Sequence, residues 1–250
     1  MTAAARRRGL LEGRRATRAI SPLAACALSL ACPGGSPAKA QVSAAVSLFN
    51  DLRFRGYSLS DGRPVGVLDL SYDAPNGLYG AVSGSIVASR GEGLKPLGFI
   101  VNGGYATRVS PRMSLDLGVT HSSYSKYSDR AASLSYTEVY AGISGKLVSA
   151  RLNLSPDYVK GGSAYGELNG NWPLGKRLSF TAHAGLVVPF RTVHPGYRYS
   201  EDVDWRLGIA RIAGPVSIQA AWSAVRPGHG AYRDRRHKRD ALIVGLTYSL

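Results

Sequence analysis

The stretch "MSLDLGVTHS", Met113 to Ser122, alternates strictly between two kinds of side chain. Its apolar positions are Met113, Leu115, Leu117 and Val119, and the positions between them are Ser114, Asp116, Gly118 and Thr120. In a β-strand, successive side chains point to opposite faces, so a period of two separates these residues by face. The stretch therefore predicts a strand with one apolar face and one polar face.

The same alternation recurs along the chain, for example at 178–188, 203–209 and 216–222. No long segment has the helical spacing of apolar residues, and no apolar run after residue 40 is long enough for a membrane helix. The sequence predicts an all-β chain. Twelve strands are expected, at 42–53, 64–74, 77–89, 97–107, 112–123, 133–147, 149–158, 163–173, 177–189, 201–212, 215–225 and 239–250.

The connections between these strands alternate in length. Those at 75–77, 108–111, 174–176 and 213–215 are tight, whereas those at 54–63, 90–96, 124–132, 190–200 and 226–238 are longer and more polar. Short turns at one end and long loops at the other are typical of bacterial outer-membrane barrels. A closed barrel also pairs every backbone group, which lipid requires. We therefore expect a closed antiparallel transmembrane β-barrel of about 12 strands over residues 41–250.

Aromatic residues stand near several of the predicted strand ends. Such residues form girdles at the two interfaces of a membrane barrel, although ordinary core packing is the alternative for each. The candidates for these girdles are Tyr72, Tyr79, Tyr105, Tyr158, Trp172 and Trp222.

Residues 1–40 have the pattern of a cleaved signal peptide. Six arginines precede the apolar run "AISPLAACALSLAC", and "AKA" ends at Ala40, where cleavage would leave a mature chain that starts at Gln41. The formal net charge is +15 for the whole chain, and loss of the seven basic residues and one acidic residue of this segment lowers it to +9. Both cysteines also leave, so the mature chain has neither a disulfide nor a cysteine metal site. The alternative is a lipoprotein signal, "LAAC", with Cys26 acylated.

The last ten residues, "ALIVGLTYSL", place apolar or aromatic side chains at every second position. These are Leu242, Val244, Leu246, Tyr248 and Leu250. The pattern resembles the C-terminal strand that the barrel-assembly machinery recognises in outer-membrane proteins, except that such strands most often end in Phe. The barrel-assembly machinery is therefore an expected partner, and the bacterial outer membrane the expected location.

The segment "NDLRFRGYSLSDGRP", Asn50 to Pro64, joins the first two predicted strands. It resembles the N-terminal hairpin of the TorF family of outer-membrane proteins, also called Gcw_chp, with the pattern S-D-Y-R-F-R-G-x-S-x-S-D-G-x-P. Ten positions match: Asp51, Arg53, Phe54, Arg55, Gly56, Ser58, Ser60, Asp61, Gly62 and Pro64. Leu52 replaces the usual Tyr, and Val82 stands at an expected Trp in the following hairpin, 68–85. The resemblance covers 41–250, is strongest in the first hairpins and implies a barrel and a channel without an established substrate.

The expected function is passive diffusion of small hydrophilic solutes through a porin without cofactor. "NDLRFRG" is expected to end the first strand on the inward face, and "YSLSDGRP" to form an outer loop with a turn at Asp61-Gly62. Strand phase predicts a pore lined by residues of both charges, which gives no clear ion selectivity. They are Asp51, Arg53, Asp69, Asp116, Glu138, Lys146, Arg151, Asp157, Glu167, His183, Asp204 and Arg206. Alternatively, these charges pair and plug a structural barrel.

Two other patterns in the sequence suggest other functions. His121 and Ser123 lie two residues apart and so share a face, as a general base and nucleophile would, which vaguely resembles outer-membrane lipid A deacylases. No third member is identifiable, so we expect no enzyme. The basic loop 232–240 could face lipopolysaccharide phosphates through Arg233, Arg235, Arg236, Lys238 and Arg239, or be a solvated charge run. Outer-membrane location argues against nucleic acid as a partner, and His194, His229 and His237 lack metal-ligand spacing.

Overall fold

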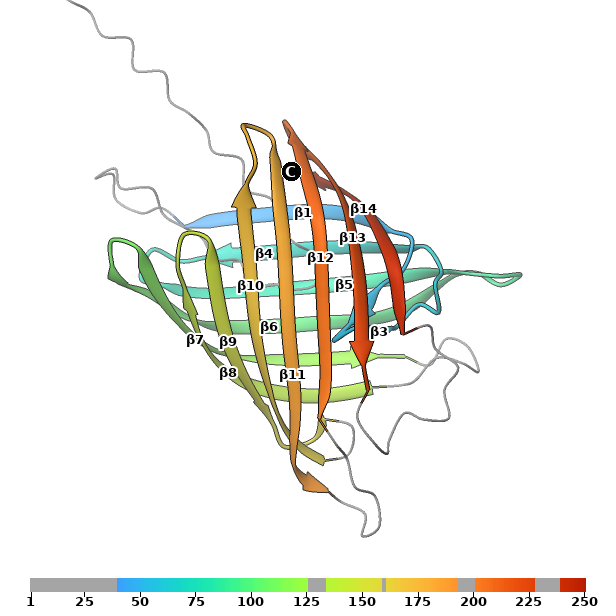
Figure 1. Cartoon of the computed structure of the whole chain (residues 1–250), viewed down its shortest axis with the longest axis horizontal. Helices are drawn as coiled ribbons and strands as arrows, with labels where there is room; N and C mark the ends of the chain where they lie inside the picture. Colours follow the sequence, from blue (N-terminus) through green and yellow to red (C-terminus); the bar gives the residue numbers. More distant parts are fainter. Residues whose placement is uncertain (1–39, 126–133, 159–160, 193–200, 228–238) are drawn as a thin grey trace, which may run out of the picture.

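A computed structural model describes residues 40–125, 134–158, 161–192, 201–227 and 239–250. In these ranges, twelve strands form a closed antiparallel barrel (Figure 1). They are β1 (Gln41–Phe49), β4 (Val65–Asp73), β5 (Leu78–Ser89), β6 (Gly93–Ser110), β7 (Met113–Tyr124), β8 (Leu134–Ser144), β9 (Val148–Ser155), β10 (Gly161–Pro173), β11 (Leu178–Thr192), β12 (Asp202–Ala213), β13 (Val216–Arg226) and β14 (Asp240–Ser249). No helix in the described residues is long and apolar enough to cross a membrane.

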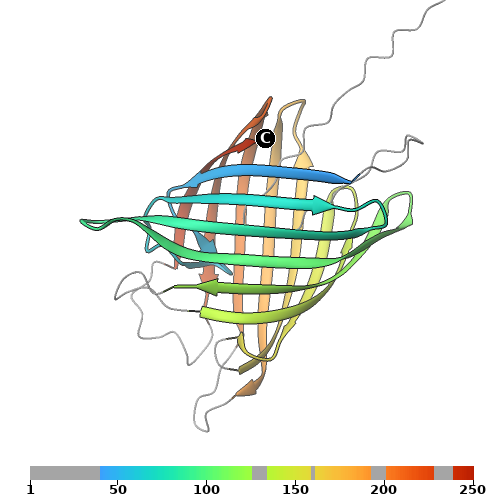
Figure 2. The ribbon, with the colours of Figure 1, turned by 180° about the vertical axis from the view of Figure 1, so that it is seen from behind.

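The first strand closes the barrel by pairing on both sides. β1 pairs with β14 from Ala45↔Ser249 to Phe49↔Gly245, and with β4 from Gln41↔Asp73 to Phe49↔Val65. Figure 2 shows this blue strand beside the cyan strand β4 at the front of the barrel. Every other strand pairs with its neighbours in chain order, so the wall has no open edge.

The predicted fold class and strand number are confirmed, and the largest differences in strand bounds are at the end of the first strand and at the start of β6. The first strand ends at Phe49 rather than at residue 53, because the side chain of Asn50 accepts a bond from Val244 N and donates one to Leu242 O. The chain then leaves the wall. β6 begins at Gly93, within the predicted 90–96 connection, and its hairpin with β5 extends beyond the neighbouring strands (Figure 1).

The two faces of the wall carry opposite chemistry. Leu117 is 59% exposed on the outside, whereas its neighbour Asp116 is 3% exposed on the inside. The same difference holds along β14, where Leu242, Val244, Leu246 and Tyr248 face outward. A continuous apolar exterior is unfavourable in water but suits the hydrocarbon region of a membrane.

Four of the six predicted girdle residues lie at outward positions, namely Tyr72, Tyr105, Trp172 and Trp222. The prediction was wrong for Tyr79 and Tyr158, which face the interior. The hydroxyl of Tyr79 bonds to Asp116, and the ring of Tyr158 lies against Arg55. Tyr79 lies at an inward position of β5, and Tyr158 lies beyond the end of β9. Polar partners are available in both places.

An apolar cluster lies inside the barrel beneath the place where β1 meets β4 and β14. It consists of Phe49, Leu52, Val65, Val67, Val87, Leu97 and Ile243, with Leu59 and Ala241 packed against it. Leu52 and Leu59 belong to the segment between β1 and β4, so this cluster holds that segment inside the wall.

We expect an arginine on the outward face to cost more near the middle of a strand than near its end. Leu207→Arg, in the middle of β12, should lower the free energy of unfolding in lipid by about 2–4 kcal/mol, because it places a charge in hydrocarbon. Val203→Arg, on the same face but at the second residue of β12, should lower the free energy of unfolding by about 0–1 kcal/mol. Denaturant titration in phospholipid vesicles measures both, and equal losses would contradict a lipid-facing exterior.

Candidate functional site

The segment Asp51–Arg63 folds into the barrel, and we call it the lumen hairpin. It contains the two short strands β2 (Arg53–Phe54) and β3 (Tyr57–Ser58), which pair with each other and not with the wall (Figure 1). Asp51, Arg53 and Arg55 are 4%, 3% and 7% exposed. The prediction of a longer first strand followed by an outer loop was therefore wrong for this segment.

Two turns with positive φ angles shape the lumen hairpin. Arg55 and Gly56 have φ angles of 46° and 77°, and they form the two-residue turn between β2 and β3. Asp61 and Gly62 have φ angles of 53° and 68°, and Arg63 N donates to Ser60 O across them. Both pairs have the two positive φ angles that a type I′ turn requires, and such a turn favours Gly at its second position. The turn predicted at Asp61-Gly62 is present.

The carboxylate of Asp51 holds the base of the lumen hairpin together. Its Oδ1 accepts bonds from Ser58 Oγ, Ser60 Oγ at 2.8 Å and Gly62 N at 3.2 Å. Its Oδ2 lies 2.9 Å from Arg53 Nε, and Arg53 Nη1 donates to Gly56 O at 2.8 Å. One carboxylate thus connects both arms of the hairpin through Arg53, Ser58 and Ser60.

The guanidinium of Arg55 fixes the tip of the hairpin to the wall. Its Nη2 lies 2.6 Å from Glu138 Oε1 on β8. Its Cζ lies 4.0 Å from the ring centroid of Tyr165 and 4.4 Å from that of Tyr158, within cation–π range. Burial disfavours the charged guanidinium, but Tyr158 and Glu138 outweigh it and raise the pKa of Arg55 above its ordinary value. Arg55 therefore stays charged, and its Nε and Nη1 have no hydrogen-bond partner among the described residues.

Gly56 presses the same tip against β12 and β13. A Cβ at this position would lie 2.6 Å from Val225 Cβ and 3.0 Å from Asp204 Cβ. Gly56 therefore meets β12 and β13, on the β14 side of the β1–β4 junction, whereas Arg55 reaches across the lumen to β8. The hairpin crosses the lumen and is held at both ends, by the apolar cluster at its base and by Arg55 and Gly56 at its tip.

A second polar network lies nearer the short turns. Asp116 accepts a bond from Tyr79 and lies 2.5 Å from Arg151 Nη2, while the guanidinium of Arg151 stacks 4.1 Å from the ring of Tyr140. The tyrosine side chains lie close against glycines of neighbouring strands, since a Cβ at Gly104 would meet Tyr79 and one at Gly118 would meet Tyr140. These inward tyrosines were not predicted as lumen residues. A Tyr at an inward position beside an inward Gly on the next strand could have indicated them.

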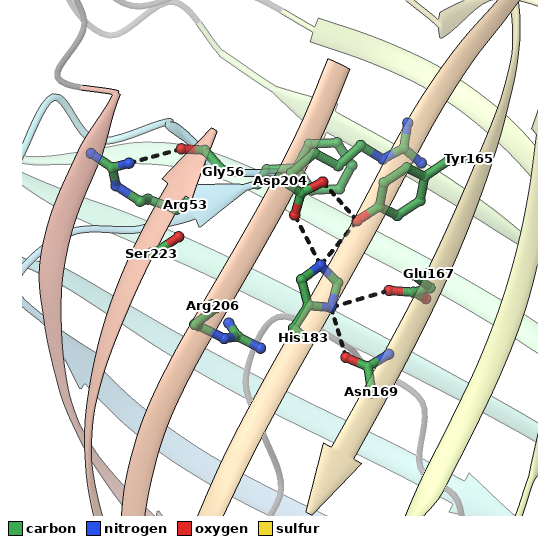
Figure 3. A pocket seen from close by; sticks show the side chains of 11 residues that line it. Arg53, Gly56, Tyr165, Glu167, Asn169, His183, Asp204, Arg206 and Ser223 are labelled. Carbon is green, nitrogen blue, oxygen red and sulfur yellow. Dashed lines mark hydrogen bonds and ion pairs between the residues drawn. The ribbon is translucent and has the colours of Figure 1, made fainter. Parts of the chain in front are cut away.

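A polar cavity remains between the hairpin and β10–β13. Its volume is about 50 Å³, which is room for about four water molecules. His183 lies among the polar side chains of this cavity (Figure 3). Its Nε2 is 2.9 Å from Asp204 Oδ1, and its Nδ1 is 2.7 Å from Asn169 Oδ1. Tyr165 donates to Asp204 at 3.1 Å. The cavity is lined by Arg53, Phe54, Arg55, Gly56, Tyr165, Glu167, Asn169, His183, Asp204, Arg206 and Ser223.

Most of the residues predicted to line the pore lie inside the barrel. Asp51 and Arg53 belong to the hairpin, and eight others lie on the inward face of the wall: Asp69, Asp116, Glu138, Arg151, Glu167, His183, Asp204 and Arg206. Lys146 differs, because it is exposed in the turn between β8 and β9 and lies outside any strand. Asp157 lies exposed beyond the end of β9 and accepts a bond from Thr137 N.

Of the two other candidate sites, the His121–Ser123 pair is described in full and the basic loop only in part. His121 lies on the outward phase of β7 with Nδ1 3.0 Å from Thr137 Oγ1, and its ring lies 6.1 Å from that of Phe99. The structure records no hydrogen bond between His121 and Ser123, both of which are described. In the basic loop, Arg239 is exposed, whereas Arg233, Arg235, Arg236 and Lys238 lie outside the described residues, as does the predicted signal peptide.

The barrel is similar to solved outer-membrane porins and channels. It matches a NanC porin with a TM-score of 0.52 and 11% identity over 84% of this chain and 100% of that one. It matches a KdgM porin with a TM-score of 0.51 and 14% identity over 83% and 99% of the two chains. It matches the COG4313 outer-membrane channel of Pseudomonas putida F1 with a TM-score of 0.50 and 12% identity over 88% of this chain and 98% of that one. These likenesses define the class as a porin-like β-barrel.

The sequence assigns the chain more narrowly. A family model described as "Bacterial protein of unknown function (Gcw_chp)" matches residues 34–245, so the chain belongs to the Gcw_chp family. The comparison with curated proteins gives no match. The family carries no assigned activity, so the function has to be argued from the lumen itself.

Gly56→Ala should loosen the tip of the hairpin. The new Cβ meets Val225 and Asp204 and also has to adopt a positive φ, and overpacking of this kind costs about 1–3 kcal/mol. Gly62→Ala is the matched control, because it has a similar φ of 68° but nothing within 4 Å. Hydrogen exchange of the hairpin amides should become roughly tenfold faster in the first variant than in the second. Equal exchange rates would show that the tip does not press on the wall.

Glu138→Gln should destabilise the barrel by about 3–5 kcal/mol, because it leaves the buried Arg55 without its carboxylate. The double variant Arg55→Met/Glu138→Met removes both charges and should lose clearly less stability. The free energy of unfolding in lipid distinguishes these outcomes. If Glu138→Gln loses no more free energy of unfolding than the double variant, the ion pair does not fix the tip.

Proposed function

We propose that this protein is an outer-membrane channel that lets small hydrophilic solutes diffuse through a lumen narrowed by the lumen hairpin. The observation that carries the proposal is the closed wall with an apolar exterior, a polar interior and a polar cavity beside the hairpin. A twelve-stranded barrel is wider than the eight-stranded kind that side chains fill. The hairpin reduces this width and leaves a polar cavity beside it along β10–β13.

Four further expectations from the sequence, on the family, the signal peptide, the last strand and the basic loop, fit this proposal. The motif at Asp51–Pro64 supports membership of the TorF group of porins, and its residues all have a role in the hairpin or its turns. Residues 1–40 would serve as the cleaved signal peptide, and β14 would be recognised by the barrel-assembly machinery. The basic loop around Arg239 would face the phosphates of lipopolysaccharide.

A second function, a barrel that does not conduct, is favoured by a different observation. The hairpin is tied to opposite sides of the wall, and its charges are already paired with Glu138 and Asp51. The cavity beside it holds only a few water molecules. In this alternative the hairpin is a permanent plug that stiffens the barrel.

Planar-bilayer conductance of the refolded protein separates the two functions. The wild type should show small single-channel steps, and a variant in which a short Gly-Ser turn replaces residues 51–63 should show steps several times larger, because the lumen is cleared. The turn is feasible because Phe49 and Val65 are direct partners in the wall.

If the shortened variant shows single-channel steps and the wild type shows none, the wild-type barrel is plugged by the hairpin. Silence from both proteins, with folding confirmed by the slower migration of the unheated barrel on a gel, would rule out a channel of any width.

A further inference from the structure

The charged residues of the lumen cavity fall into two groups. Arg53 is paired with Asp51, Arg55 with Glu138, and Asp204 lies against His183 and Tyr165. Arg206 and Glu167 are different. Among the described residues, Arg206 makes no hydrogen bond and no ion pair within 4.0 Å, and the one basic nitrogen within that range of the Glu167 carboxylate is His183 Nδ1, at 3.9 Å.

These two charges face one cavity from strands on either side of His183. His183 on β11 stands opposite Arg206 on β12 and opposite Asn169 on β10, while Glu167 is two residues from Asn169. Figure 3 shows Arg206 and Glu167 on the two sides of the imidazole. Neighbouring strands are spaced by about 4.8 Å, so the two backbones are about 10 Å apart. A cation and an anion are thus held near each other without contact.

The rest of the cavity offers hydrogen-bonding groups. Asn169 and Ser223 line it, and Arg55 contributes Nε and Nη1, which have no hydrogen-bond partner among the described residues even though Arg55 is 7% exposed. Buried N–H groups of this kind are costly unless an acceptor reaches them. The lining therefore has unused capacity to bind a polar solute.

We propose that this cavity binds a small zwitterion of the α-amino acid class, with its carboxylate on Arg206 and its ammonium group on Glu167. This inference rests on the proposed channel and names the class of solute that it selects. A solute with only one charge pairs with one of the two residues and leaves the other charge in a narrow, partly dehydrated space. A zwitterion satisfies both, and the room for about four water molecules sets the size limit at a few heavy atoms.

The test measures binding, so that it does not depend on conduction. Saturation-transfer NMR on the folded barrel in detergent micelles would compare glycine with its two halves, acetate and methylammonium, at neutral pH. Glycine should bind at least about tenfold more tightly than either half. Arg206→Gln and Glu167→Gln should each remove this preference, since each leaves one end of the zwitterion without a partner.

Matched controls exist for both substitutions. Arg211→Gln changes an exposed outward arginine of the same strand β12, and Glu201→Gln changes an exposed glutamate outside the cavity. Both controls should bind glycine as the wild type does. Gel migration of the unheated barrel checks that each variant is folded.

Two results would overturn the proposal. Equal binding of acetate and glycine, lost in Arg206→Gln and kept in Glu167→Gln, would make the cavity a plain anion site. Absence of any glycine binding by the folded wild type would remove the site. If glycine binds as expected and the bilayer shows no conductance, the site stands and the channel function fails, so the two failures are distinguishable.

Discussion

The pairing of β1 with both β14 and β4 is the constraint on which the rest of the structure depends. In lipid, an unpaired backbone group costs several kcal/mol, so a sheet that spans a membrane has to close on itself. Closure at twelve strands then sets the width of the interior. That interior is too wide for wall side chains to fill, and the residues that point into it need partners from elsewhere.

The lumen hairpin supplies many of those partners. Its base adds Leu52 and Leu59 to an apolar cluster inside the wall, and its tip brings Arg55 to Glu138 and to a group of tyrosines. The hairpin thereby pairs the inward charge of Glu138, whereas Asp116 is paired with Arg151 within the wall itself. What remains is a small cavity along β10–β13, in which Arg206 and Glu167 face each other across His183.

Much of the wall could be predicted from single residues. The alternation at Met113–Ser122 correctly placed Leu117 outside and Asp116 inside, and the same reasoning placed Glu138, Asp204 and Arg206 in the lumen. It placed Lys146 wrongly, because strand phase carries no information once the chain has entered a turn. It also missed Tyr79 and Tyr140, since a tyrosine is amphipathic and suits either an interfacial girdle or a polar interior.

The sequence by itself determined the barrel, because a period of two along the chain is a local property that each strand carries independently. Turn chemistry was equally local, and Asp61-Gly62 could be read as a turn without knowledge of the rest. The tertiary structure alone decided that Asn50–Pro64 folds inward. That outcome depends on contacts between residues far apart in the chain, such as Arg55 with Glu138 and Gly56 with Val225, which exist only after the wall has closed.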